Sequence, residues 1–283
     1  ALEAQVVPNQ YVLKASSWLG SVSQASSIIG PTLGGIAYAF LGVSTTYWII
    51  AGLFVLAWSF MYLVSPKPKP MIKEGESMWE SIRLGIRYVL SNQIIIGSMS
   101  LDLFAVLFGG AIALLPIFAS DILKVGPQGF GLLNAAPSVG ALLVMLWATR
   151  RPPAKHAGRT LLLCVAGFGV SIIVFALSRN FYLSLLALMF SGLFDGMNMV
   201  IRRSIIRFMS PEHMRGRIAS VSGMFIGASN ELGAFESGIA DKLFGVTRAV
   251  WLGGIVTLLV VLGVSIKAHK LRKLNLENPH NVK

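Results

Sequence analysis

The sequence predicts an all-α, polytopic membrane helical bundle. Of the 283 residues, 54% are hydrophobic and 13% are charged, whereas charged residues make up about 25% of typical soluble domains. The mean hydropathy of +0.70 points to the same class. The apolar residues form runs long enough to cross a bilayer, which takes about 20 residues as an α-helix. The short alternating segments typical of a transmembrane β-barrel are missing from the sequence, so the spans are predicted to be helices.

Eight spans are predicted in order along the chain. They cover residues 15–41, 44–64, 93–118, 128–149, 160–178, 181–201, 218–241 and 247–267. Each run contains or adjoins Gly, Pro, Ser or Ala residues, whose small size lets membrane helices approach closely. The spans are therefore expected to pack against one another as a bundle.

The first span carries the sequence GPTLGG near its middle. Gly30 and Gly34 form a GxxxG pair, and Gly35 extends the same stripe of small residues, a pattern typical of close helix packing. Pro31 lacks a backbone N–H and is predicted to kink the helix. The stripe has two interpretations: ordinary tight packing, or a smooth surface along which helices slide during a conformational cycle.

A linker is predicted between the second and third spans, over residues 65–92. It opens with SPKPKP, which favours an extended segment, and continues as MWESIRLGIRYVLSN. In this second part, apolar residues recur at helical spacing, which predicts an amphipathic helix on the cytoplasmic surface. The linker separates residues 1–64, with two spans, from residues 93–267, with six, and a basic cytoplasmic tail follows over residues 268–283.

Basic residues cluster on one side of the predicted spans. The N-terminal stretch and every second loop hold 20 Lys and Arg residues, whereas the other loops hold only Lys124, Arg179, Lys242 and Arg248. Cytoplasmic loops of membrane proteins carry the excess of Lys and Arg. Both ends of the chain are therefore predicted to be cytoplasmic. The same clustering accounts for the net charge of +12 without a nucleic-acid partner.

An internal repeat relates two distant parts of the chain. Residues 8–48 align without gaps on residues 211–251, at an offset of 203, with 12 identities in 41 positions. The aligned pairs include Gly30 with Gly233, Gly35 with Gly238, Gly42 with Gly245 and Trp48 with Trp251. Such a repeat predicts two duplicated helical halves. The first-half counterpart of residues 93–207 would precede residue 1, so the chain is expected to be a fragment of a longer pseudo-symmetric protein.

Six polar residues inside the predicted spans are the candidates for handling substrate or protons. A charge at the bilayer centre costs roughly 2.5–3.5 kcal/mol on insertion scales, so each charged group needs a partner, a proton or a cavity. The candidates are Asp102, Asp195, Asn198, Arg202, Glu231 and Glu236.

Each candidate has two interpretations. Asp102 could line a cavity or pair with a cation across the bundle. Asp195, Asn198 and Arg202 recur on one face of the sixth span, either as a gate whose ion pair breaks between two states or as a static salt bridge. Glu231 and Glu236 could take up protons in an exchange cycle, or they could form interhelical hydrogen bonds.

Nothing in the sequence indicates an enzyme. There is no phosphate-binding GxxxxGK[ST] pattern, and no Ser-His-Asp arrangement suggests itself on the helices. The four histidines lie in loops or the tail without metal-ligand spacing, so neither a metal nor a cofactor is expected. The single cysteine, Cys164, lies in an apolar run, where core packing is its expected role.

Three segments resemble the major facilitator superfamily of transporters. The GPTLGG sequence is similar to the Gly-Pro motif in the fifth helix of its exporters. Residues 211–238 resemble the tenth-to-eleventh helix region of bacterial exporters related to the enterobactin exporter, and residues 101–123 resemble their seventh helix. The resemblance implies twelve helices in two six-helix halves around a central cavity, driven by a proton gradient. The eight spans would then be helices 5 to 12, with residues 1–64 as the last two helices of the N-terminal half.

One cytoplasmic motif of that superfamily is incomplete here. The loop between the predicted fourth and fifth spans reads ATRRPPAKHAGRT. Gly158 and Arg159 fit the end of the motif, but Lys155 stands where an acidic residue is expected, so a charge latch in this half is not supported. In a second loop, Arg215, Gly216 and Arg217 are expected to set the topology and to clamp the connection between helices 10 and 11.

The resemblance implies proton-coupled efflux of amphipathic organic molecules, siderophore or drug-like, by alternating access in a bacterial inner membrane. The expected partners are the lipid bilayer, a small organic substrate, protons, and the first four helices in the same or a separate chain. The alternative is a truncated or split-transporter product without transport activity of its own. A channel is disfavoured because the two-half repeat suits rocking around a central site, and an intramembrane enzyme because no catalytic constellation is present.

Overall fold

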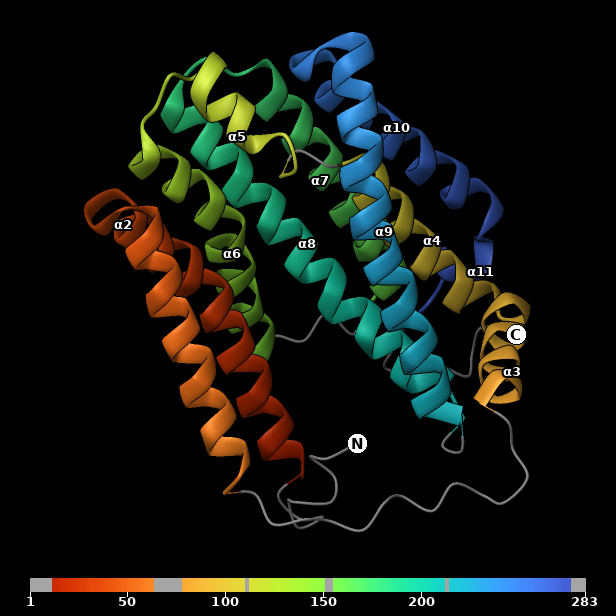
Figure 1. Cartoon of the computed structure of the whole chain (residues 1–283). Helices are drawn as coiled ribbons and strands as arrows, with labels where there is room; N and C mark the ends of the chain where they lie inside the picture. Colours follow the sequence, from red (N-terminus) through yellow and green to blue (C-terminus); the bar gives the residue numbers. More distant parts are fainter. Residues whose placement is uncertain (1–11, 64–77, 110–111, 151–154, 212–213, 276–283) are drawn as a thin grey trace. The chain divides into compact units, whose positions relative to one another are not determined.

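The computed structural model describes residues 12–63, 78–109, 112–150, 155–211 and 214–275, and regular structure in these residues is helical throughout. The chain divides into two compact units. Unit 1 contains helix α2 (Val12–Met61) together with residues 127–135, and unit 2 contains the remaining helices. Each unit is described on its own below (Figure 1).

Helix α2 of unit 1 is two antiparallel helices joined at a glycine (Figure 1). The backbone leaves the helical region at Gly42, where φ is 75° and ψ is 173°. Side chains strongly disfavour this conformation, so a glycine permits the reversal. The backbone stays helical at Pro31. The break therefore lies at Gly42, between the predicted spans 15–41 and 44–64, and not at the proline.

Gly245, which the internal repeat aligns with Gly42, has nearly the same backbone conformation. Its φ is 81° and its ψ is 153°, and it joins helix α9 (Arg215–Phe244) to helix α10 (Val246–Lys267). These are the two glycines with positive φ among the described residues. The repeat in sequence thus coincides with a repeat in local structure, in which a long helix ends at a glycine and an apolar helix begins directly after it.

Unit 2 begins with two helices that meet at a sharp bend. Helix α3 (Met78–Ser91) and helix α4 (Gln93–Phe108) are bent by 96° at Asn92. The Asn92 side chain accepts hydrogen bonds from the backbone N–H groups of Ile94 and Ile95, which caps α4. Within α3, which lies in the predicted linker, Val89 is buried, whereas Arg83 and Arg87 are exposed.

The expected continuous span over residues 93–118 is interrupted. Helix α4 ends at Phe108, and a short helix α5 (Leu115–Ile117) and a π-helix η2 (Phe118–Ile122) follow. Gly109 closes α4 through its backbone N–H, which donates to the carbonyl of Ala105 at 2.8 Å. The sequence GGAIALLP after Phe108 contains two glycines, a residue type common where helices end, and a proline, which stands in the first turn of α5. The sequence analysis did not predict this break because residues 93–118 form one apolar run.

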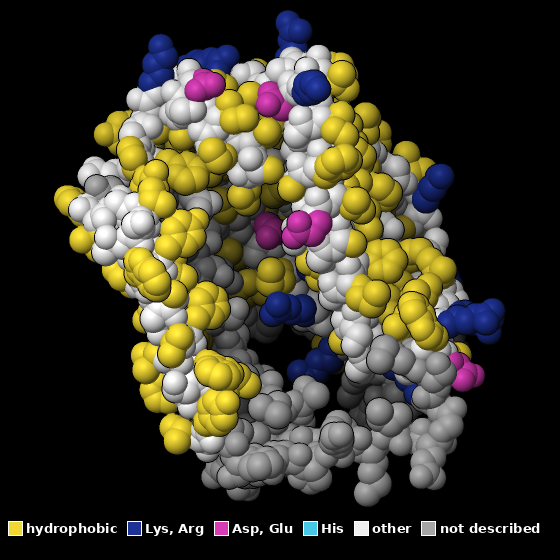
Figure 2. Space-filling model, viewed as in Figure 1, with side chains coloured by type: hydrophobic (Ala, Val, Ile, Leu, Met, Phe, Trp, Pro, Cys, Tyr) yellow, Lys and Arg dark blue, Asp and Glu magenta, His cyan; other side chains and the backbone are white. Residues whose placement is uncertain are grey.

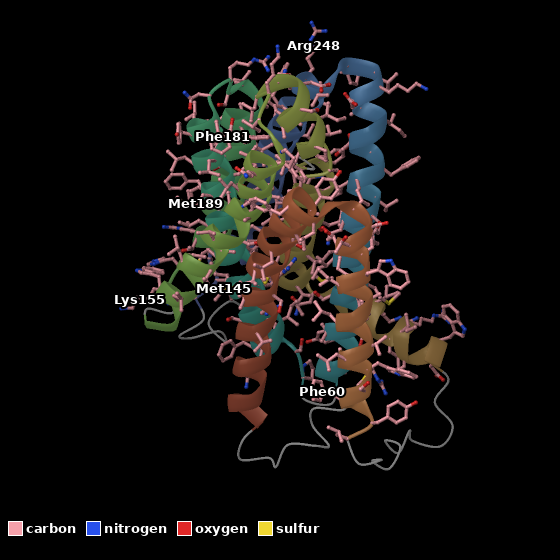
Figure 3. All side chains as sticks on the ribbon, turned by 60° about the vertical axis from the view of Figure 1, so that its left-hand side comes forward. Phe60, Met145, Lys155, Phe181, Met189 and Arg248 are labelled. Carbon is pink, nitrogen blue, oxygen red and sulfur yellow. The ribbon has the colours of Figure 1, made fainter. Side chains whose placement is uncertain are left out.

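The other helices of unit 2 are α6 (Pro127–Arg150), whose first turns belong to unit 1, α7 (Ala157–Leu177), α8 (Phe181–Met209) and α11 (His269–Arg272). Helix α7 packs against both α8 and α10, and α4 packs against α9, α10 and α8. Their inward faces form an apolar core that includes Leu101, Leu161, Val165, Ile201 and Ile205. Lys155 and Arg248 lie toward opposite ends of this unit (Figure 3).

The described residues contain five helices long and apolar enough to cross a membrane, or up to six if α3 and α4 form one bent span. This is fewer than the eight spans expected. Helix α4 has only 16 residues. Helix α9 is long enough at 30 residues, but its middle is rich in Gly, Ser, Asn and Glu, which lowers its hydropathy. Large apolar side chains cover much of the visible surface (Figure 2), as expected for a polytopic membrane bundle.

Candidate functional site

The candidate site is a buried ion pair with an amide beside it, formed by Asp102, Asn198 and Arg202. We call these three residues the polar cluster. The Arg202 guanidinium forms a salt bridge with the Asp102 carboxylate. The Asn198 side-chain Nδ2 donates a hydrogen bond to Asp102 Oδ1 at 2.7 Å. Asp102 and Arg202 are each 4% exposed and Asn198 is 3% exposed, so water contributes little to their solvation.

Helices α4 and α8 position the polar cluster. Asn198 and Arg202 are four residues apart on α8, which places them on the same face one turn apart, and Asp102 faces them from α4. Helix α8 is capped by Asn180, whose side chain accepts from the backbone N–H groups of Tyr182 and Leu183. Leu101 and Ile201, the chain neighbours of the two charged residues, are buried in the apolar core. The cluster is therefore held by well-packed helices rather than by loops.

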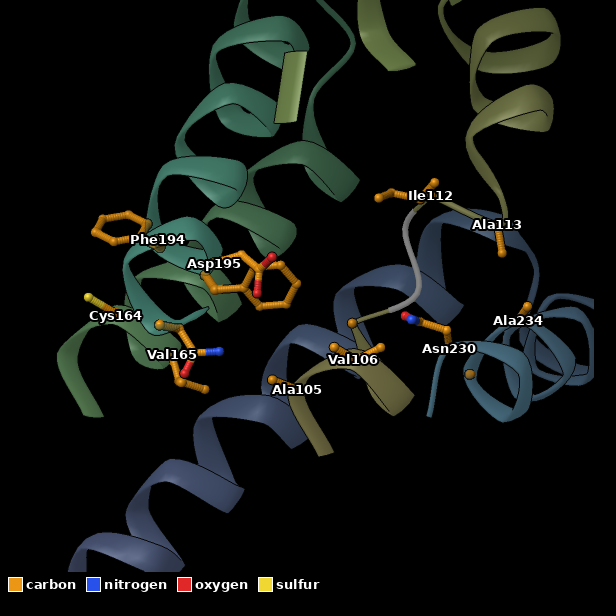
Figure 4. A pocket seen from close by; sticks show the side chains of 14 residues that line it. Ala105, Val106, Ile112, Ala113, Cys164, Val165, Phe194, Asp195, Asn230 and Ala234 are labelled. Carbon is orange, nitrogen blue, oxygen red and sulfur yellow. The ribbon is translucent and has the colours of Figure 1, made fainter. Parts of the chain in front are cut away.

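A cavity of about 350 Å³ lies beside the polar cluster (Figure 4). Its polar lining comes from Asp195, Asn198 and Asn230, and Asp195 on α8 faces Asn230 on α9 across it. We call it the upper cavity. The rest of its wall is made of apolar and small residues: Ala105, Val106, Gly109, Ile112, Ala113, Cys164, Val165, Phe168, Phe194, Gly233 and Ala234. A small amphipathic molecule matches such a lining.

A second cavity, of about 620 Å³, lies further along the same two helices, α8 and α9. We call it the lower cavity. Its lining residues are Met199, Arg202, Arg203, Ile206, Arg207, Ala219, Ser222, Gly223 and Ile226. Asn198 lines the upper cavity and Arg202 lines the lower one, so the polar cluster stands where the two cavities approach each other.

The structure pairs Arg202 with Asp102 and not with Asp195, its neighbour in the predicted stripe on α8. Asp195 is partly buried and lines the upper cavity. Sequence patterns could not choose between the two acids, because Asp102 is distant in the chain and only the packing of α4 on α8 brings it close.

Glu231 and Glu236 of α9 occupy different surroundings. Glu231 is exposed, whereas Glu236 is partly buried. Glu236 is the one charged residue lining a third, apolar cavity of about 420 Å³, together with Leu107, Leu232, Phe235, Ile239, Ala240, Leu243 and Phe244. The two glutamates thus do not form a single site with the polar cluster.

The glycines of the repeat differ in how closely they are packed. A Cβ at Gly233 would lie 2.9 Å from the carbonyl oxygen of Val106, so this glycine lets α9 approach α4. A Cβ at Gly30, Gly34 or Gly238 would meet nothing within 4 Å. The surroundings of the Pro31 side chain and of Gly35 lie outside the described part of the structure.

The candidate loop residues lie where helices begin. Gly158, at the start of α7, approaches the backbone of Leu271 in α11 so closely that a Cβ could not fit, and its N–H donates to the Leu274 carbonyl at 3.4 Å. Arg159 beside it is exposed. At the start of α9, the backbone of Arg217 lies against Gly85 of α3, and a Cβ at Gly216 would face open space. The Arg215 side chain is outside the description.

The sequence analysis did not single out Asn230 or Phe168, which line the upper cavity. Asn230 was a polar residue inside an apolar span, a signal that could have identified it as a lining residue. Phe168 carries no such signal, because a phenylalanine in an apolar helix is indistinguishable from a core residue. Among the described residues, no group of three His, Cys, Asp or Glu side chains could hold a metal ion.

The all-helical bundle with its long apolar helices is the architecture of a polytopic membrane protein of the major facilitator type. The chain belongs to the transmembrane secretion effector family of that type, whose family profile matches residues 2–282. This family consists of transporters and not of enzymes.

Curated relatives match the chain at low identity. The multidrug efflux pump Tap of Mycolicibacterium fortuitum is 27% identical over 267 residues, which cover 93% of this chain and 64% of that protein. The enterobactin exporter EntS of Escherichia coli O1:K1 is 24% identical over 265 residues, covering 90% of this chain and 63% of the exporter. The chain thus spans slightly less than two thirds of the length of these relatives.

Two solved structures share the fold. A bacterial homologue of the human lysosomal transporter Spinster, in an inward-facing and unoccupied conformation, superposes with a TM-score of 0.65 at 14% identity and covers 99% of this chain and 74% of the homologue. An inward-facing bacterial homologue of the iron transporter ferroportin gives a TM-score of 0.64 at 19% identity, with coverage of 96% and 66%. At these identities, the similarity concerns the fold alone.

Proposed function

We propose that the protein serves in the export of amphipathic organic molecules, drug-like or siderophore, across a bacterial inner membrane in exchange for protons. Family membership supports membrane transport. Two relatives carry the names of a multidrug efflux pump and an enterobactin exporter, which favours the outward direction. The 20-to-4 distribution of basic residues supports a cytoplasmic location for both ends of the chain.

The observation that carries the proposal is the position of the polar cluster between two cavities. The apolar wall of the upper cavity suits the body of an amphipathic substrate, and Asp195, Asn198 and Asn230 suit its polar groups. Charge separation is costly in an apolar interior, so the Asp102–Arg202 pair opens only when something compensates the charge it leaves behind. A proton on a carboxylate provides such compensation. Alternation between a state with the ion pair formed and a state with it broken would then link proton uptake to the access of substrate to each cavity.

The proposal is tested with the protein at the length that the cell produces, reconstituted in proteoliposomes. A fluorescent amphipathic dye is the transported probe, and its movement is followed with and without an imposed pH gradient. We expect dye transport that the gradient drives and that collapses when a protonophore is added. Asp102→Asn should lose most gradient-driven transport while it retains dye binding, because the amide keeps the shape of the carboxylate but cannot take up a proton, and Asp102 does not line the upper cavity.

Asp121→Asn is the matched control. Asp121 is an exposed acid in η2, outside the cavities, so its amide variant should transport like the original protein. Dye transport that proceeds equally without a gradient would refute proton exchange. If the chain is inactive alone but active after coexpression with a polypeptide of four membrane spans, the split-transporter alternative would be supported instead.

A further inference from the structure

The lower cavity contains an unbalanced concentration of positive charge. Arg202, Arg203 and Arg207 of α8 all line it, and none of the acidic residues that the structure describes does. Arg202 is paired with Asp102. Arg203 and Arg207 are exposed and lie one turn apart, and neither has an ion-pair partner among the described residues. Within the part of the chain that the structure describes, the cavity therefore presents two guanidinium groups without a counter-charge.

The remaining wall of the lower cavity is largely apolar. Met199 and Ile206 of α8 face it together with Ile226 of α9, and Ala219 and Gly223 leave room between the helices. One hydroxyl, that of Ser222, adds a polar group on α9 and belongs to a largely buried side chain. The volume of about 620 Å³ is within the range of sites that enclose a small molecule. The lining thus combines an apolar surface with the guanidinium groups of Arg203 and Arg207.

We propose that the lower cavity binds the oxyanion head of an amphiphile, with its apolar part against Met199, Ile206 and Ile226. The two sources of this chemistry are the phosphodiester of an anionic phospholipid and a phosphate group on a soluble amphiphile. A guanidinium presents a planar fork of donors that matches phosphate oxygens in two-point contact. Basic pockets between membrane helices on the cytoplasmic side are suited to anionic headgroups, and the distribution of basic residues predicts that side for Arg203 and Arg207.

Simple snorkelling of the two arginines to the membrane surface is the competing explanation. It requires no cavity and no particular anion, so it predicts little difference between these arginines and any other basic residue near the surface. A built site predicts that Arg203 and Arg207 are special. The inference concerns binding and does not rest on the proposed transport activity, so failure of one leaves the other testable.

The test measures lipid retention by the full-length protein in nanodiscs. One set of discs contains phosphatidylcholine alone, and a second contains phosphatidylcholine with a minor fraction of phosphatidylglycerol. Native mass spectrometry counts the lipids that remain bound after the discs are removed. We expect the original protein to retain phosphatidylglycerol preferentially. Arg203→Gln and Arg207→Gln should each weaken retention roughly fivefold, because a basic residue near an anionic surface contributes on the order of 1 kcal/mol, and the double variant should weaken it further.

Arg248→Gln is the matched control, since Arg248 is exposed and lies at the predicted opposite side of the membrane. It should retain phosphatidylglycerol like the original protein. Dodecyl phosphate added to phosphatidylcholine discs distinguishes the sources. If dodecyl phosphate binds to the original protein and this binding is lost in the double variant, the site takes soluble oxyanions as well. Retention of phosphatidylglycerol without binding of dodecyl phosphate identifies a lipid site. Equal retention by the double variant, the control and the original protein would overturn the proposal.

Discussion

A buried guanidinium and a buried carboxylate depend on each other far more than an exposed pair does. In the polar cluster, Arg202 and Asp102 are both almost inaccessible to water, and Asn198 supplies a further hydrogen bond to the carboxylate. Removal of one charge leaves the other without solvent or partner. The cluster is therefore stable as a set of three, and any event that neutralises one member destabilises the arrangement of the others.

This dependence predicts strong coupling between Asp102 and Arg202. Asp102→Asn and Arg202→Gln should each lower the free energy of unfolding by about 3–5 kcal/mol, because each leaves an unpaired buried charge. The double variant should lose less than the sum of the two single losses, since no lone charge remains. Denaturant titration in mild detergent measures all four proteins.

Arg203→Gln serves as the control for that cycle, because Arg203 is the chain neighbour of Arg202 but is exposed. Its effect on stability should be within about 0.5 kcal/mol, as for most surface substitutions. If the losses of the two single variants simply add in the double variant, the ion pair does not stabilise this state of the protein.

Only part of the polar cluster could be predicted from the sequence. The cost of charge in an apolar span identified Asp102, Asn198 and Arg202 individually, and helical spacing placed the last two on one face. The contact of α4 with α8 could not be predicted from the sequence, because it depends on how two apolar helices pack. Many relative positions of two such helices bury a similar apolar area. Without that contact, Asp195 was the nearer partner for Arg202.

At the scale of helices, Gly42 and Gly245 determine where two long helices end. Both have positive φ with ψ near the extended value, a region that is essentially restricted to glycine. The repeat in the sequence aligned these two residues, but their shared conformation was not predictable from the alignment. The same limit applies to the interrupted span after Phe108, where Gly109 ends α4 and Pro116 lies in the first turn of α5, but both residues lie within an unbroken apolar run of the sequence.

Replacement of either junction glycine should destabilise the protein through the backbone alone. A Cβ at Gly42 or Gly245 would meet no atom within 4 Å, so steric crowding by neighbours does not contribute. Gly42→Ala and Gly245→Ala should each cost about 1–3 kcal/mol, the range for residues forced into sparsely populated backbone regions. Unfolding in mild detergent measures the loss.

Gly52→Ala is the control for the junction variants. Gly52 lies within the second helix of α2, and a Cβ there also faces open space. Alanine is favoured over glycine inside a helix by roughly 0.5–1 kcal/mol, so this variant should be slightly more stable than the original protein. Loss of stability in all three variants would show that the positive φ angles are not the cause.

At the scale of the whole molecule, the arrangement of charge along the chain specifies a topology that the helices alone do not. The apolar criterion finds five or six spans in the described residues, whereas the charge distribution of 20 to 4 alternates correctly only with eight. The two criteria disagree on residues 15–41 and on helix α9. Its basic residues Arg215 and Arg217 are at one end and Lys242 is at the other, so the charge distribution predicts that α9 crosses the membrane despite its polar middle.

The eight-span topology predicts which positions are reachable from outside the cell. Cys164 is the only cysteine and is buried, so a Cys164→Ser background provides single reporter sites. Arg179→Cys and Lys242→Cys should react with an impermeant maleimide in intact spheroplasts, because both belong to the side with few basic residues. Lys155→Cys and Arg207→Cys should react only after permeabilisation.

Because α9 separates Arg207 from Lys242 in the chain, opposite labelling of these two positions would show that α9 spans the bilayer. Labelling of both positions from the same side would show that α9 does not cross the bilayer, and it would remove the basis for assigning both chain ends to the cytoplasm.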